Sequence, residues 1–451
     1  MTAARPGTAA AIAAAVRAGT YSAREAVELA LRRIEEVDGG IEAYREVRVF
    51  AALREADLVD ARPDRDRLAL AGVPVAVKDN VPVTGEALRN GSAATDDTPR
   101  TSDHEVVRRL RAAGAVVVGL TNTPELCVFG TTDSAAAVTR NPWNRRVSPG
   151  GSSGGAAAAV AAATVPVAHG NDGMGSIRIP AACCGLVGLK PGSGVVPADL
   201  GNGSWFGMAE NGPLATTVQD AALTFAVMAD RPVAPLADPA PLRVAVSVRA
   251  PVVGTPVHPD WVAAARTTGD ALAAAGHRVR TAEVPYPARL VLSQAVRWTA
   301  GTELDARLVA DRSRLQVRTA RHAALGRAAL RLGLPREQGR TSWRSRAERF
   351  FTDHDVLVTP ALAQSPPRAR AWSERGWLAN VWSNARYAPF AAPWNLAGWP
   401  ALTLPTGEPG PTGTPLAVQL VCPPGGEDTL LALAAQLERA RPWRRTVDDL
   451  G

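Results

Sequence analysis

Two glycine- and serine-rich segments decide the interpretation of this chain: GGSSGG at residues 150–155 and GNDGMGSIR at residues 170–178. Glycines before a serine let the backbone approach a substrate carbonyl closely and point successive N–H groups inward. The second segment can therefore form an oxyanion hole, which stabilises the charge that develops during attack on a carbonyl. We predict this hole at Gly173, Met174, Gly175 and Ser176, with Ser176 as the nucleophile.

The same pattern has simpler explanations. A flexible linker is one, although the first segment is only six residues long and lies between predicted structured elements. A phosphate cradle at a helix N-terminus is another, but there is no Gly-Lys-Ser/Thr ending and no G-x-G-x-x-G after a strand. Ordinary tight turns are the third.

A serine hydroxyl is a poor nucleophile until a base takes its proton, and the composition points to that base. Of the 50 lysines and arginines, only Lys78 and Lys190 are lysines. Arginine stays protonated at working pH, whereas a buried lysine can lose its proton and act as a base. Lys78 is therefore the candidate base, and a serine of the segment at residues 150–155 could carry the proton between Lys78 and Ser176. His169, on the strand before the second segment, is more typical of a packed residue.

The bulk composition is that of an ordinary globular protein, with 451 residues of which 46% are hydrophobic and 21% charged. Twelve arginines lie between residues 307 and 349, but no aromatic ladder or groove-reading motif accompanies them. We expect solvated helix faces there and no nucleic-acid partner. No stretch approaches the ~20 apolar residues of a membrane span, and Arg17 interrupts the alanine-rich stretch at residues 8–20, which favours a folded helix over a secretory signal.

Cysteine usage indicates the compartment. The four cysteines show no C-x-x-C spacing, and two of them are adjacent, at Cys183 and Cys184. A disulfide framework is therefore not expected, and a reducing cytoplasm is the predicted location. No metal site and no cofactor are predicted.

Helical and strand patterns alternate along the chain, which predicts the α/β class. Capping boxes at Ser22-x-x-Glu25, Ser102-x-x-Glu105 and Thr217-x-x-Asp220 predict helix starts. Predicted strands cover residues 70–77, 115–120, 244–248 and 277–284, and further helical patterns cover 259–275 and 304–350. Residues 230–241 are the expected linker, and the chain is predicted to be loop-rich from Pro360.

Several further motifs strengthen the pattern. They are VAVKDN at residues 75–80, GLTN at 119–122, RNPW at 140–143, CGLVGLKP at 184–191, GPLA at 212–215, DVLVTP at 355–360, NLAG at 395–398 and VQLV at 418–421. Together with the two serine segments they resemble the amidase signature family. The resemblance implies a single compact α/β domain with a central mixed sheet covered by helices on both faces.

The resemblance also implies the division of the chain and the roles of site residues. A helical segment at 1–65 would pack on an amidase signature domain at 66–451, with the signature region at 148–192 and a variable pocket region at 290–390. Ser176 would be acylated, Ser152 would bridge from an unusual cis peptide bond, and Lys78 would be a neutral base. The supporting residues would be Ser153, Asp172 and Arg178, although Asp172 and Arg178 can equally be a stabilising pair.

Two features bear on the substrate. Asn171 and Met174 stand where the family commonly has threonine and glycine, and the Met174 side chain is expected to shape the pocket. An aromatic lining for a hydrophobic or aryl acyl group is predicted from Met174, Trp298, Trp343, Trp382 and Tyr387. Five of the eleven tryptophans lie at residues 372–399, and each of these aromatic residues can instead fill core or surface.

The expected function is hydrolysis of a small-molecule carboxylic amide to an acid and an amine or ammonia. Three alternatives stay open: an acyltransferase or amide-forming enzyme with the same acyl-enzyme, an A-type subunit of a glutamine amidotransferase, and a non-catalytic binding protein on the same scaffold. The last would need a broken relay, whereas Lys78, Ser152 and Ser176 are all present. A homodimer is left open.

Overall fold

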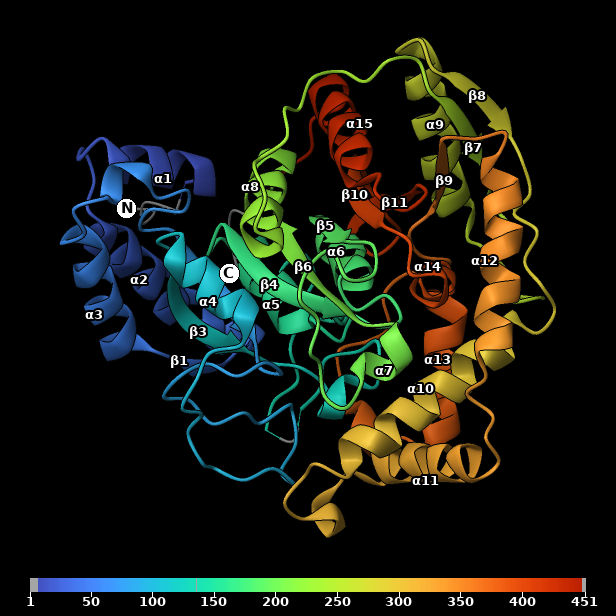
Figure 1. Ribbon diagram of the computed structural model, residues 1–451, viewed down its shortest axis with the longest axis horizontal. Helices are drawn as coiled ribbons and strands as arrows, with labels where there is room; N and C mark the ends of the chain where they lie inside the picture. The colour runs from blue at the N-terminus through green and yellow to red at the C-terminus, as the bar shows by residue number, and fades with distance from the viewer. Residues whose placement is uncertain (1–6, 135, 448–451) are drawn as a thin grey trace.

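A twisted mixed β-sheet runs through the middle of the computed structural model, which describes residues 7–134 and 136–447 (Figure 1). In this part of the chain the sheet has eleven strands, in the order β1-β3-β2-β4-β6-β5-β10-β11-β9-β7-β8. The strands are β1 (Tyr44–Val47), β2 (Pro74–Lys78), β3 (Val116–Thr121), β4 (Val167–Asp172), β5 (Val187–Lys190), β6 (Glu210–Ala215), β7 (Arg243–Val246), β8 (Arg278–Thr281), β9 (Val356–Pro360), β10 (Ala401–Pro409) and β11 (Pro415–Val421).

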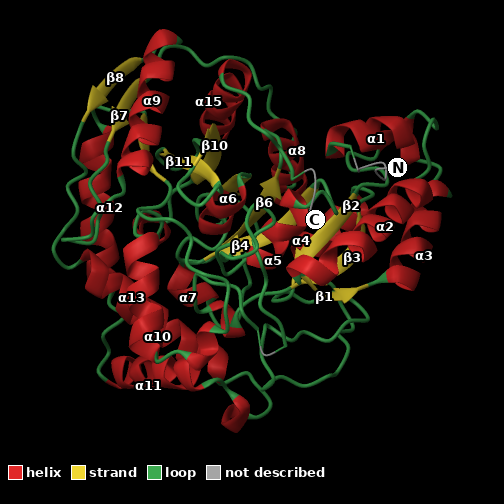
Figure 2. Cartoon of the chain, turned by 180° about the vertical axis from the view of Figure 1, so that it is seen from behind, coloured by secondary structure: helices red, strands yellow, loops and turns green. Residues whose placement is uncertain are grey.

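Helices pack on both faces of this sheet (Figure 2). They are α1 (Ala9–Arg17), α2 (Ala23–Ile41), α3 (Val49–Asp60), α4 (Glu105–Ala112), α5 (Gly154–Ala161), α6 (Arg178–Cys184), α7 (Ser204–Gly207), α8 (Val218–Ala229), α9 (Pro259–Ala274), α10 (Leu290–Ala306), α11 (Val317–Arg331), α12 (Glu337–Phe351), α13 (Trp377–Tyr387), α14 (Ala392–Ala397) and α15 (Glu427–Ala440). The predicted α/β class, mixed sheet and single compact domain are confirmed.

Parallel pairing places Lys78 and the second serine segment at the same end of neighbouring strands. β2 pairs in parallel with β4, with Val77 opposite His169. The carboxyl ends of neighbouring parallel strands meet at the same edge, so Lys78 at the end of β2 lies near the turn that follows Asp172. Between the segments, every residue of α5 is buried. Its residues are mostly alanine and glycine, which are small enough to let this helix pack directly against the sheet.

The N-terminal segment was expected to be helical, but it also contributes a strand to the sheet. β1 lies within residues 1–65 and pairs antiparallel with β3 as an edge strand. The first turn of α1 is also held by α8, because the N–H groups of Ala9 and Ala10 donate to the Asp220 carboxylate at 2.9 and 3.0 Å. Residues 1–6 of the predicted N-terminal segment and residues 448–451 of the predicted amidase signature domain lie outside the described residues.

Local sequence signals were mostly reliable. The predicted capping boxes begin α2, where the Ser22 hydroxyl and Glu25 bond reciprocally, and α8, where Thr217 accepts from the Asp220 N–H. The prediction at Ser102 was wrong: His104 caps α4, and its Nδ1 accepts from the Val106 N–H at 3.2 Å.

Two regional predictions need correction. The chain beyond Pro360 was expected to be loop-rich, but it contributes α13, α14, α15, β10 and β11. The arginine-rich helices are not merely solvated faces, because Arg318 is buried and lies 2.9 Å from the Asp133 carboxylate. Among the described residues, no helix is both long and apolar enough to cross a membrane.

Candidate active site

Lys78, at the end of β2, is fully buried and has two close polar neighbours. Its Nζ lies 2.7 Å from Ser152 Oγ and donates to Asn171 Oδ1 at 2.7 Å. Burial disfavours the ammonium form and lowers the pKa of Lys78, while the Cys127 thiol and Asp172 oppose part of that shift. The amine is therefore biased toward the neutral form that a base requires.

Both lysines of the chain are fully buried, which supports the interpretation of the lysine-poor composition. Lys190, at the end of β5, donates to the Pro191 carbonyl at 2.6 Å. Burial lowers its pKa, and the nearby Arg178 guanidinium adds to this effect. Of the two, Lys78 is the lysine that contacts a serine of the signature segments.

The loop at residues 150–155 presents Ser152 to Lys78 and links it to the nucleophile segment. The peptide bond between Gly151 and Ser152 is cis, as the family resemblance implied. The Ser153 N–H donates to the Ser176 carbonyl at 3.1 Å, and the Asn171 N–H donates to Ser153 Oγ at 3.4 Å. Ser153 therefore joins the first segment to the second through both its backbone and its hydroxyl.

A buried ion pair holds the turn that carries Ser176. The Arg178 guanidinium donates to both oxygens of Asp172 at 2.9 Å. It also donates to Gln419 Oε1 at 2.7 Å and to Asn395 Oδ1 at 2.6 Å. Burial on its own would raise the pKa of Asp172, but Arg178, together with Lys190 and Asn395, outweighs it and holds that pKa well below its usual range. This carboxylate is therefore a charged brace for the turn.

The brace changes the predicted oxyanion hole. The Gly175 N–H donates to Asp172 Oδ1 at 2.6 Å, so it is already engaged and does not point at a substrate. A glycine is required there because φ is +115°. The N–H groups of Gly173, Met174 and Ser176 are left as the candidate donors.

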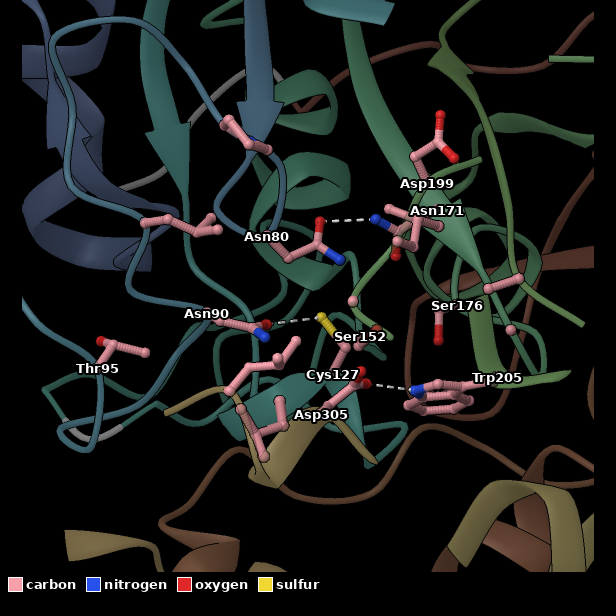
Figure 3. A pocket seen from close by; sticks show the side chains of 18 of the residues that line it. Asn80, Asn90, Thr95, Cys127, Ser152, Asn171, Ser176, Asp199, Trp205 and Asp305 are labelled. Atoms are coloured by element: carbon pink, nitrogen blue, oxygen red, sulfur yellow. Dashed lines mark hydrogen bonds between the residues drawn. The ribbon is translucent and has the colours of Figure 1, made fainter. Parts of the chain in front are cut away.

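Ser176 is 9% exposed and lies at the meeting point of two cavities. The first, here called the polar cavity, has a volume of about 440 Å³; its lining includes Asn80, Asn90, Arg100, Ser152, Asp199 and Asp305 (Figure 3). The second, called the apolar cavity, has a volume of about 160 Å³; its lining includes Phe129, Met174, Ile179, Val291, Trp298 and Val381. Ser176 and Trp205 line both.

The predicted aromatic pocket is only partly correct. Met174 and Trp298 line the apolar cavity. Trp343 does not: it is fully buried in the core, where its Nε1 donates to the Pro393 carbonyl at 2.7 Å. Trp382 is 66% exposed and lines neither cavity. Tyr387 lies behind the cavity wall, with its hydroxyl donating to the Gly130 carbonyl.

The tryptophan-rich segment at residues 372–399 therefore does not supply an aromatic lining. Trp394 and Trp399 are buried in the core, and Trp377 Nε1 donates to His322 Nδ1 at 3.0 Å. The side chains that this segment contributes to the apolar cavity are smaller and include Asn384, Ala385 and Ala388.

His169 is a packed residue, as its strand position suggested. It is buried, its Nε2 lies 2.9 Å from Asn211 Oδ1, and burial lowers its pKa to about 3. An imidazole of such low pKa is a weak base, and it lines neither cavity at Ser176.

Sequence reasoning missed two residues that contact the site. Asn171 was noted only as a departure from the family pattern, yet it accepts a hydrogen bond from Lys78 and its Nδ2 donates to Asn80 Oδ1 at 2.6 Å (Figure 3). Trp205 lines both cavities and is held by a hydrogen bond from Nε1 to Asp305 Oδ2 at 2.7 Å. Its left-handed φ of +52° carries no clear sequence signal.

Comparisons with known proteins show which family the chain belongs to. The chain is 42% identical over 443 residues to AmiB2 of Mycobacterium tuberculosis, a protein named as an amidase without a stated substrate, with 94% of each chain covered. The structure of a 6-aminohexanoate cyclic dimer hydrolase matches with a TM-score of 0.87 and 32% identity, covering 98% of this chain and 99% of that one.

A bacterial aryl acylamidase of the amidase signature enzymes shares the fold, with a TM-score of 0.84 at 24% identity over 97% of each chain. The family model described as "Amidase" matches residues 25–431. On these matches, over nearly its whole length, the chain belongs to the amidase family, whose reaction is amide hydrolysis.

Proposed function

We propose that this amidase forms an acyl-enzyme at Ser176 and that Ser152 and Lys78 relay the proton. Neutral Lys78 keeps one N–H on Asn171 Oδ1, which leaves its lone pair free to accept the Ser152 proton. Ser152 in turn takes the proton of Ser176 as Ser176 Oγ attacks the amide carbonyl. The supporting observation is the 2.7 Å distance between the buried Lys78 Nζ and Ser152 Oγ, with Ser152 and Ser176 lining one cavity.

Attack places negative charge on the carbonyl oxygen. The N–H groups of Gly173, Met174 and Ser176 are the proposed donors to it, because Asp172 already accepts from Gly175. The loss of one oxyanion donor typically costs about 10²–10³ in rate. Asp172 and Arg178 act on this step only by fixing the turn.

Collapse of the tetrahedral intermediate breaks the carbon–nitrogen bond. The departing nitrogen must receive a proton, which Ser152 supplies while Lys78 returns its own to Ser152. Water then attacks the acyl carbonyl as the same relay takes one of its protons. When this second tetrahedral intermediate collapses and the acid departs, the relay returns that proton to Ser176 Oγ. The relay therefore ends the cycle in its starting protonation state.

Variants of the relay test the proposal. Lys78→Arg replaces the amine with a guanidinium of similar length that cannot lose its proton, so we expect kcat/KM for amide hydrolysis to fall by about 10²–10⁴. We expect kcat/KM of Ser152→Ala to fall by a similar factor. Ser153→Ala is the matched control, because Ser153 is adjacent and equally buried but does not contact Lys78, and its loss should be much smaller.

Circular dichroism and thermal unfolding establish that each variant is folded. A folded Lys78→Arg enzyme with full activity would contradict the relay, and so would equal losses in Ser152→Ala and Ser153→Ala. Product analysis with added hydroxylamine identifies the acceptor: we propose water, and predominant hydroxamate at low hydroxylamine concentration would indicate an acyltransferase.

We also propose a reducing compartment such as the cytoplasm. All four cysteines are buried and unpaired, at Cys127, Cys183, Cys184 and Cys422. Adjacent Cys183 and Cys184 on α6 remain thiols, and burial raises the pKa of each. Thiol counting on protein purified without reductant tests this assignment.

A further inference from the structure

The two cavities at Ser176 differ in chemistry and share one large side chain, that of Trp205. Trp205 lines both of them, and its hydrogen bond to Asp305 fixes the indole in place. The polar cavity exposes amides, carboxylates and a guanidinium, whereas no charged residue lines the apolar cavity in the described part of the chain. An amide bound at Ser176 therefore has two dissimilar spaces for its two halves.

The relay determines which half occupies which space. Ser152 must reach the departing nitrogen to protonate it, and Ser152 lines the polar cavity but not the apolar one. The amine half must therefore leave through the polar cavity. The acyl half, on the other side of the carbonyl carbon, then occupies the apolar cavity. This step rests on the proposed function.

One face of α10 forms a firm wall of the apolar cavity. Val291, Gln294, Ala295 and Trp298 line it at the three- and four-residue spacing of a single helix face. Trp298 is anchored: its Nε1 donates to the Val128 carbonyl at 3.0 Å, and its ring packs edge-on against Phe129 at a centroid distance of 6.0 Å. The opposite side includes Val381 and Ala385 of α13.

The size of the apolar cavity limits the acyl group. Its volume of about 160 Å³ is close to the roughly 150 Å³ of an apolar protein cavity that binds benzene. A ring of benzoyl size therefore matches this space, whereas an acetyl group leaves most of it empty. A charged acyl group finds no counter-ion there, which also disfavours glutamine as the acyl donor.

A buried polar group marks this cavity as a ligand site. Gln294 is 6% exposed, and its Nε2 has no hydrogen-bond partner among the described residues. Buried side-chain amides are usually bonded, so an unpaired one suggests a group that arrives with the substrate. Gln294 would therefore favour a ring that carries one hydrogen-bonding substituent.

We propose that the substrates are amides of aromatic carboxylic acids, with a single ring of benzoyl size in the apolar cavity and ammonia or a polar amine in the polar cavity. Two substrates with the same amine test the acyl half: N-(4-nitrophenyl)benzamide and 4-nitroacetanilide both release 4-nitroaniline. We expect kcat/KM to be on the order of tenfold or more higher for the benzoyl substrate.

A pair of cavity-filling variants tests the assignment of the two halves. Ala295→Leu narrows the apolar cavity, so the ratio of benzoyl to acetyl kcat/KM should fall at least about tenfold. Val309→Trp narrows the polar cavity and should leave that ratio unchanged, because the amine is common to both substrates. Calorimetric binding of benzamide and acetamide to Ser176→Ala gives a second readout that needs no catalysis, with benzamide expected to bind more tightly.

The outcomes separate the inference from the proposed function. A wild-type ratio at or below one, or a ratio that responds to Val309→Trp and not to Ala295→Leu, would overturn the aromatic acyl assignment while leaving the relay intact. Tighter binding of acetamide than benzamide to Ser176→Ala would overturn it as well. Absence of hydrolysis of every amide would instead refute the proposed function.

Discussion

Asn171 offers a specific test of how the base is held. Lys78 Nζ donates to Asn171 Oδ1 at 2.7 Å inside a buried site, and Asn171 Nδ2 is fixed in turn by Asn80 Oδ1 at 2.6 Å. Asn171→Leu removes the acceptor and leaves a buried N–H unpaired, which costs about 1–3 kcal/mol. If the transition state bears this whole cost, kcat/KM falls by about 5- to 150-fold.

Asn171→Asp tests the same contact by replacing the neutral amide with a negatively charged carboxylate. A carboxylate at this position stabilises the ammonium form and raises the pKa of Lys78. Because the relay needs neutral Lys78, activity rises as pH rises through that pKa. In the wild type the midpoint of the acid limb of the kcat/KM profile should lie below the ordinary lysine pKa of 10.5. In Asn171→Asp this midpoint should move to higher pH.

The assay is kcat/KM against pH for one amide substrate, with thermal unfolding measured for each variant. Asn171→Thr is the conservative control, because its hydroxyl can accept from Lys78 but the shorter side chain lacks the NH₂ group that donates to Asn80. We expect its loss to lie between those of wild type and Asn171→Leu. A folded Asn171→Asp enzyme whose acid limb is unshifted would refute the claim that this contact affects the pKa of Lys78.

Three further substitutions probe the turn and the fold. Arg178→Met leaves the Asp172 carboxylate buried without its partner and should lower the free energy of unfolding by about 3–5 kcal/mol in urea titrations; no measurable change would contradict the brace. Gly173→Ala places a Cβ 2.9 Å from the Trp205 ring, so displacement of the turn should lower kcat/KM by about 10²-fold, and an unaffected rate would exclude this backbone from the oxyanion hole. Ser22→Ala removes the α2 cap, far from the site, and should cost about 0.5–2 kcal/mol of stability with kcat unchanged.

Sequence chemistry predicted the relay residues because the reaction constrains residue types closely. A base that must lose its proton excludes arginine, and in a chain with two lysines this exclusion points to Lys78. The hydrophobic pattern likewise predicted β2 and β3, whose residues are all buried. The base and these strands were predicted from residue types and local sequence, whereas the bridging role of Ser152 was predicted from the family resemblance.

Other features depend on tertiary geometry that the sequence does not display. The contact between Asn171 and Lys78 follows from the parallel register of β2 and β4. Asp172 engages the Gly175 N–H only through the conformation of the turn. The pocket prediction failed where tryptophans were chosen by residue type, because nothing local shows that Trp343 faces the core.

The most direct test of the central claim is the rate at which a fluorophosphonate labels Ser176, measured by intact mass and located by peptide fragmentation. We predict one adduct per wild-type chain, on Ser176, and labelling at least about 10²-fold slower in a folded Lys78→Met variant. An adduct on another residue, or a Lys78→Met variant that labels at the wild-type rate, would contradict the account.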